Sequence, residues 1–226
     1  MRLADKCMQG RRPCMLNKSW TKSQWAMPLL GALVLWSASL SVGFNILFSY
    51  EARPGPKTST PQQWPSESAL QFDRSRANLL LFVHPHCPCS RATIAEVAKL
   101  LTRYAGKLDV QIMMYKPAAL TVNWTQTDLW DGAAKLPGVR LKIDQDGTEA
   151  TRFHALISGQ TLLYDSRGHL LFAGGITQGR GHVGANRGSE AIAVLLDSGN
   201  IQPVSTPVFG CYLHGQVQSP TKERDE

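Results

Sequence analysis

Two cysteines separated by a single proline, Cys87 and Cys89, stand where an apolar segment passes into a helical pattern. Residues 78–83 form a short apolar run, which is typical of a strand buried on both faces. From residue 91 to 104 the larger apolar side chains recur every three or four positions, which predicts an amphipathic helix. A second apolar run, 108–115, predicts another strand. Cysteines at the junction of strand and helix are typical of a thiol redox site.

The position of the cysteines suggests how they are activated. A thiolate is the nucleophile in disulfide exchange, and the amino end of a helix lowers a thiol's pKa. The spacing predicts Cys87 at or near the N-cap, Pro88 at the first helical position and Cys89 next. We therefore expect Cys87 to be the more exposed thiol and the one that attacks. A bridge across one residue is expected to be strained and easily reduced, which favours an oxidant or isomerase-like couple.

Further patterns continue the order of elements. A short helix over 127–135, a strand over 139–143 and a last helix over 187–197 follow from apolar spacing and from their stop signals. Between them, the tight turn 166–168 separates two apolar segments, which predicts an antiparallel hairpin over 161–173. The order is strand, helix, strand, helix, hairpin, helix, with one more strand after the second helix.

This order is that of the thioredoxin fold, and several segments carry a narrower resemblance. The chain resembles the bacterial membrane-anchored thioredoxin-like proteins called RedB over roughly residues 75–213. The resemblance implies an α/β thioredoxin-like fold, with a central mixed sheet flanked by helices, and a thiol-redox role. The segments that carry it are 84–90, 162–165 with 172–177, 180–182 with Asn186, and 207–211.

The chain also departs from the thioredoxin pattern. Its cysteines have one residue between them instead of two, and no proline precedes the hairpin, where thioredoxins place a cis-proline that faces the cysteines. The sequence there reads Ser158-Gly159-Gln160. An extended substrate would have to dock on the backbone of Gly159 or Gln160 instead.

The amino-terminal region predicts a membrane anchor. No charged residue lies between Lys22 and Glu51, and residues 26–50 exceed the ~20 apolar residues that a spanning helix needs. The basic excess before this segment predicts a cytoplasmic N-terminus. We therefore expect a single-pass protein of the inner (cytoplasmic) membrane with its domain facing the periplasm. A cleaved signal peptide, with small residues such as Ala38 before the cleavage site, is the alternative.

The resulting domain plan has five parts. Proline marks the linker, which we expect to be a semi-extended spacer that lifts the domain off the bilayer. The parts are a cytoplasmic basic tail (1–25), a transmembrane helix (26–50), a Pro-rich linker (51–70), a thioredoxin-like domain (71–202) and a C-terminal tail carrying Cys211 (203–226).

Other side chains are candidates for supporting roles. Cys211 is either a resolving thiol or a small buried apolar residue, and we expect the tail to fold back toward the site because Pro203 and Pro207 cannot continue the last helix. His84, His86 and His182 are candidates for tuning a thiolate or binding a metal.

Three functions are compatible with these residues. The first is thiol–disulfide exchange by Cys87 and Cys89, which requires no cofactor and leaves open whether the protein is an oxidoreductase in the enzymatic sense. The second is binding or delivery of copper or zinc by the same cysteines with nearby histidines and Cys211. The third is a structural bridge on an interaction module.

The composition narrows the choice of partners. The formal net charge is +7, but much of the excess lies in the first 22 residues and no basic run is interleaved with aromatics, so we expect no nucleic acid as partner. The expected partners are protein thiols or disulfides of the cell envelope.

Overall fold

A computed structural model of the chain describes residues 23–199 and 202–214. The expectations for the basic tail before residue 23 and for the end of the C-terminal tail after residue 214 lie outside the described residues. The chain divides into two compact units, residues 1–47 and residues 48–226.

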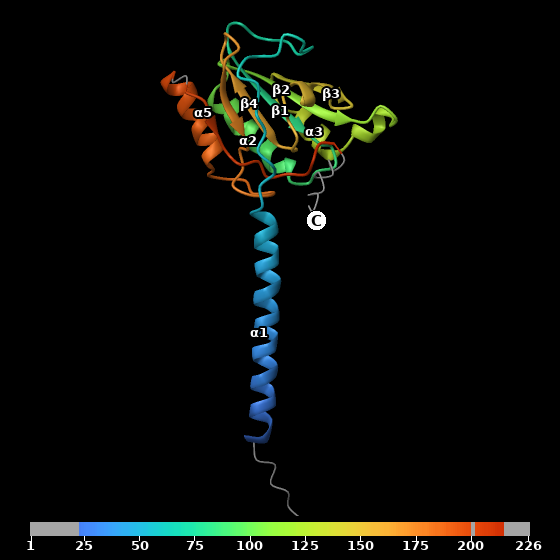
Figure 1. The fold of residues 1–226 in the computed structure, drawn as a ribbon, viewed down its shortest axis with the longest axis vertical. Helices are drawn as coiled ribbons and strands as arrows, with labels where there is room; N and C mark the ends of the chain where they lie inside the picture. The colour runs from blue at the N-terminus through green and yellow to red at the C-terminus, as the bar shows by residue number, and fades with distance from the viewer. Residues whose placement is uncertain (1–22, 200–201, 215–226) are drawn as a thin grey trace, which may run out of the picture. The chain divides into compact units, whose positions relative to one another are not determined.

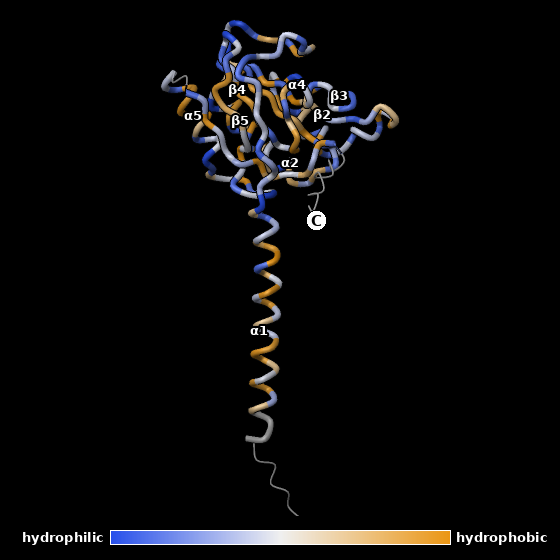
Figure 2. The backbone as a smooth tube through the Cα atoms, in the orientation of Figure 1, coloured by the Kyte–Doolittle hydropathy of each residue, from blue (hydrophilic) through white to orange (hydrophobic). Residues whose placement is uncertain are grey.

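The first long element is α1 (Ser23–Glu51), a helix of 29 residues. From Met27 to Glu51 it is long and apolar enough to cross a membrane. Figure 2 shows hydrophobic residues along its length. The helix therefore includes the predicted span of residues 26–50 and extends beyond it at both ends.

The second unit is built on a sheet of six strands in the order β3-β2-β1-β4-β5-β6 (Figure 1). β1 pairs in parallel with β2, and β2 with β3, whereas β4 is antiparallel to both of its neighbours. The strands are β1 (Ala77–Val83), β2 (Leu108–Lys116), β3 (Val139–Gln145), β4 (Gln160–Tyr164), β5 (Leu170–Gly174) and β6 (Val204–Ser205).

The longer helices of this unit confirm those predicted from apolar periodicity in the sequence. Asn186 caps the last helix by accepting a hydrogen bond from the Ser189 amide, and Gly199 ends it in the left-handed conformation. The helices of this unit are α2 (Ser90–Arg103), the 3-10 turn η1 (Val122–Thr125), α3 (Asp128–Ala134), α4 (Thr148–Arg152) and α5 (Arg187–Ser198). Only η1, α4 and the two-residue β6 were not predicted, because each is too short to show a period.

β1 lies at the centre of the sheet and is buried on both faces. Leu79 and Leu81 pack into the cluster that includes α2, α3 and α5. Leu80 and Phe82 pack on the opposite face against Phe153. Burying both faces fixes the strand, so the cysteine loop that follows its carboxyl end starts from a rigid position.

The proline-rich linker lies along the domain instead of leading away from it. Within residues 48–226, the Gly55 amide donates to the Val208 carbonyl at 2.8 Å, and the Trp64 amide donates to the Gly168 carbonyl at 2.8 Å. Leu70 is buried in the core. Residues 51–70 were expected to form a semi-extended spacer, but backbone hydrogen bonds and apolar side chains hold this segment against the hairpin and the tail.

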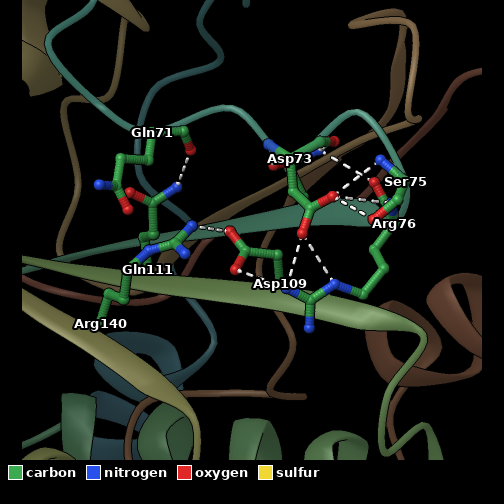
Figure 3. A network of polar contacts seen from close by, with 8 residues as sticks. Gln71, Asp73, Ser75, Arg76, Asp109, Gln111 and Arg140 are labelled. Atoms are coloured by element: carbon green, nitrogen blue, oxygen red, sulfur yellow. Dashed lines mark hydrogen bonds and ion pairs between the residues drawn. The ribbon is translucent and has the colours of Figure 1, made fainter.

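A polar network joins the amino ends of β1 and β2 (Figure 3). The Asp109 side chain, 3% exposed, accepts a hydrogen bond from Arg140 and lies 3.6 Å from Arg76. Burial raises the pKa of Asp109, and the two guanidinium groups oppose that rise. Arg76 and Arg140 thus balance the charge of this carboxylate.

We expect Arg140→Gln to destabilise the domain, because it leaves the buried carboxylate of Asp109 with the more distant Arg76 as its remaining partner. The loss should be about 1–3 kcal/mol, since both arginines are partly exposed. Urea unfolding of the full-length protein in detergent measures it. The control is Asp128→Asn in the exposed Arg91–Asp128 pair, which should cost less than about 1 kcal/mol. Equal losses in the two variants would contradict the prediction.

Candidate active site

The cysteine loop connects β1 to α2 through a series of tight turns. The Cys87 amide donates to the His84 carbonyl at 3.0 Å, and the Ser90 amide donates to the Cys87 carbonyl at 3.1 Å. The helix begins at Ser90 with Cys89 as its N-cap. The prediction of Cys87 at or near the N-cap is therefore about two residues off, because bonds of three-residue spacing form before the regular helix starts.

The C-terminal tail returns to this loop, as its prolines predicted. The Ser158 amide donates to the Cys211 carbonyl at 2.8 Å, and the Leu213 amide donates to the Leu156 carbonyl at 2.9 Å. Ile157 and Tyr212 form an antiparallel bridge. The tail thus pairs like a short strand with the segment just before β4 and brings a third thiol to the site.

Two further contacts fix the tail where it passes the site. A Cβ atom at Gly210 would collide with the Ser158 carbonyl oxygen, so only glycine permits this close approach of two backbones. On the same residue, the Gly210 carbonyl accepts a hydrogen bond of 2.6 Å from Nη1 of Arg180. Backbone pairing, close packing and an arginine together hold Cys211 in place.

Cys87 is the thiol that this arrangement activates. Hydrogen bonds from the Cys211 thiol and amide, and from the hydroxyls of Ser90 and Ser158, lower the pKa of Cys87 to about 4 although burial opposes them. The side chain is 0% exposed. The expectation that Cys87 is the more exposed thiol is therefore wrong, and Cys89, which is only partly buried, takes that place.

The other two thiols are shifted in the opposite direction. The pKa of Cys89 is raised by burial and by the negative charge of Cys87, an effect that nearby Arg180 partly offsets. The pKa of Cys211 is raised because its thiol donates to Cys87 and because it is partly buried. At neutral pH the cluster thus holds one thiolate, on Cys87, and two thiols.

Ser158 is a site residue that sequence reasoning missed. Its Oγ accepts a hydrogen bond of 2.8 Å from the His84 amide and lies 2.7 Å from Oγ of Ser90. No cis peptide bond occurs in the described part of the chain. The sequence marked this position only by its lack of proline. Because residue 158 is a serine and not a proline, its amide donates to the Cys211 carbonyl and its hydroxyl contacts the His84 amide and Ser90.

The three candidate histidines are not gathered at the thiols. His86 Nε2 lies 3.0 Å from the Trp124 carbonyl oxygen, and the His84 ring stacks on Tyr115 with centroids 5.7 Å apart. Burial lowers the pKa of His84, although the Cys87 charge opposes this, which favours a neutral ring. His182 lies 3.3 Å from the Glu51 carboxylate. His84 alone is coupled electrostatically to the thiolate.

A metal site would need several ligands that face one point. Among residues 23–199 and 202–214, no three histidine, cysteine or acidic side chains are placed to hold one ion together. The thiol of Cys211 instead donates a hydrogen bond to the Cys87 sulfur.

Three solved structures show what the chain is similar to. A hypothetical protein of Sinorhizobium meliloti matches with a TM-score of 0.53 and 20% identity, covering 70% of this chain and 97% of its own. An uncharacterised conserved protein of Geobacillus kaustophilus matches with a TM-score of 0.53 and 14% identity, covering 75% and 94%. A secreted Mycobacterium tuberculosis disulfide oxidoreductase has a TM-score of 0.39 and 13% identity, covering 55% and 82%. No protein-family model and no curated protein matches the chain.

The sheet decides the class of fold. A central β1 flanked by parallel β2 and antiparallel β4, with α2 joining β1 to β2 and a hairpin after them, is the topology expected from the sequence. By this topology the fold is thioredoxin-like. In this thioredoxin-like domain the cysteines lie between β1 and α2, and β3 and β6 form the two edges of the sheet.

Proposed function

We propose that this protein is a membrane-anchored, extracytoplasmic thiol–disulfide exchange protein whose reactive pair is Cys87-Pro88-Cys89. The observation that carries the proposal is the stabilised thiolate of Cys87 with two further thiols beside it. In exchange, a thiolate attacks a disulfide sulfur and a second thiol resolves the mixed disulfide. Cys87 is the nucleophile, and Cys89 or Cys211 is the resolving thiol.

Its setting follows from the rest of the chain. The apolar helix α1 supplies the anchor, in the inner membrane with the N-terminus in the cytoplasm. Protein thiols or disulfides of the cell envelope are the expected partners, as the RedB resemblance also implies. Binding of copper or zinc by the same sulfurs is the second candidate, favoured by the approach of Cys211 to Cys87, and metal analysis of the purified protein tests it.

The test of function uses the full-length protein in detergent, with Cys7 and Cys14 replaced by serine so that three thiols remain. The protein is equilibrated in mixtures of reduced and oxidised glutathione, and its thiols are then trapped and mapped. We expect a disulfide containing Cys87 that forms and reverses with the redox poise. Cys87→Ser should abolish this response, because the stabilised thiolate is lost. A protein whose three thiols stay reduced at every poise would refute the proposal.

The orientation is tested separately. We expect a reporter enzyme that is active only outside the cytoplasm to be active when fused after Glu226, because the basic residues precede α1. The matched fusion to a reporter that is active only in the cytoplasm should be silent. Activity of the cytoplasmic fusion would reverse the assigned topology.

A further inference from the structure

A groove of about 630 Å³ opens beside the tail. Cys211 lines it, together with Ile157 of the segment that pairs with the tail, whereas neither Cys87 nor Cys89 does. The groove is of the size that small-molecule sites commonly have, roughly 300–1,000 Å³. Of the three sulfurs of the site, the groove therefore reaches that of Cys211 alone.

Access to the sulfurs is unequal for the same reason. Cys87 has no exposed surface, and the thiol and amide of Cys211 lie against its sulfur. Cys211 is partly exposed, lines the groove and donates a hydrogen bond to the Cys87 thiolate. An external thiol that approaches through the groove thus meets the Cys211 sulfur first.

The walls of the groove indicate the chemistry of its occupant. Arg53 and Arg180 line it, and no carboxylate belongs to the part of its lining that the structure describes. Arg53 is exposed, and Nε of Arg180 is buried without a hydrogen-bond partner in the described residues. Tyr115 and Trp124 form an aromatic wall, with centroids 6.2 Å apart. Two guanidinium groups without an opposing acid favour a small anionic molecule.

We propose that external thiols exchange with this protein at the Cys211 sulfur, reached through the groove that Arg53 and Arg180 line, and that the preferred partner is a small anionic thiol. This inference rests on the proposed function and specifies where the partner enters and what it is. It makes Cys211, on the tail, the sulfur of first contact.

The exchange starts from a Cys87–Cys211 disulfide. The thiolate of the small molecule attacks the Cys211 sulfur, a new S–S bond forms there, and the electron pair of the old bond passes to the Cys87 sulfur. Cys87 is the better leaving group, because the Cys211 amide and the hydroxyls of Ser90 and Ser158 stabilise its thiolate. A second small thiolate then attacks the small molecule's sulfur in this mixed disulfide. The Cys211 sulfur leaves and takes up a proton. In sum, one protein disulfide and two thiols give two protein thiols and one small disulfide.

The experiment uses full-length protein in detergent that lacks Cys7 and Cys14 and is oxidised with diamide. Reduction is followed with glutathione, which is anionic, and with cysteamine, which is cationic, and both rates are normalised to thiolate concentration. Acid quenching and peptide mapping identify the sulfur that carries the first mixed disulfide. We expect a Cys87–Cys211 starting bridge, glutathione on Cys211, and glutathione faster than cysteamine by roughly tenfold at low salt.

Arg53 provides the matched variants. Arg53→Gln should slow glutathione about 3- to 10-fold without slowing cysteamine, and Arg53→Lys should restore most of the rate. Arg167→Gln, on the exposed hairpin turn, should change neither.

Three results would overturn the inference while leaving the proposed function intact. They are a starting bridge of Cys87 with Cys89, a first mixed disulfide on Cys87 or Cys89, and a neutral cysteine peptide that reacts faster than glutathione regardless of Arg53. A protein that forms no reversible disulfide at all would refute both proposals.

Discussion

Cys87 is expected to remain a thiolate down to a pH of about 4, as its lowered pKa requires. Above that pH the nucleophile is present, and below it the sulfur takes up a proton and exchange should stop. Ultraviolet absorbance of the thiolate, recorded against pH in a variant that retains only the three site cysteines, measures the transition. The Cys87→Ser variant supplies the baseline, since it lacks this thiolate alone.

The cause of the low value can be tested at Cys211, whose thiol is the strongest hydrogen-bond donor to Cys87. Cys211→Ala removes that donor but leaves the backbone amide, and should raise the pKa of Cys87 by about 1 to 2. Cys211→Ser keeps a hydroxyl donor and should stay nearer the original value. If alanine and serine gave the same pKa as cysteine, the thiol of Cys211 would have no part in activating Cys87.

Gly210→Val is expected to change Cys87 from a protected thiol to an accessible one. A side chain at this position collides with the Ser158 carbonyl oxygen, so the tail must leave its place beside the segment before β4. Cys87 would then lose both its cover and the hydrogen bonds from Cys211. We expect iodoacetamide to modify Cys87 on the order of 100-fold faster at neutral pH, since burial protects a thiolate that is otherwise reactive.

The control for this variant is Gly132→Ala, because nothing lies within 4 Å of a Cβ at Gly132 in α3 and its backbone is helical. Alkylation of Cys87 should be unchanged there. Far-ultraviolet circular dichroism checks that both variants keep the sheet and helices. A Gly210→Val protein that is folded and still protects Cys87 would show that the tail is not its cover.

The sequence predicted those parts of the fold that depend on local pattern. Apolar periodicity and turn residues predicted β1, α2 and the hairpin, because in each of them the buried positions recur at regular intervals within one short segment. The return of the tail followed from its prolines. The roles of Ser158 and Arg180 did not, since they arise when segments distant in the sequence meet at one point. The expected exposure of Cys87 was wrong for the same reason, because Cys211, which contacts it, lies far along the chain.

The docked tail also imposes an order on biosynthesis. Ribosomes make Cys87 and Cys89 long before Cys211, so the central strands and α2 can form while the site is still open. During that interval the two neighbouring cysteines have only each other as intramolecular partners within the domain. The three-thiol cluster is therefore the last part of the domain to be completed, and a chain that ends before Pro207 would carry a permanently uncovered pair.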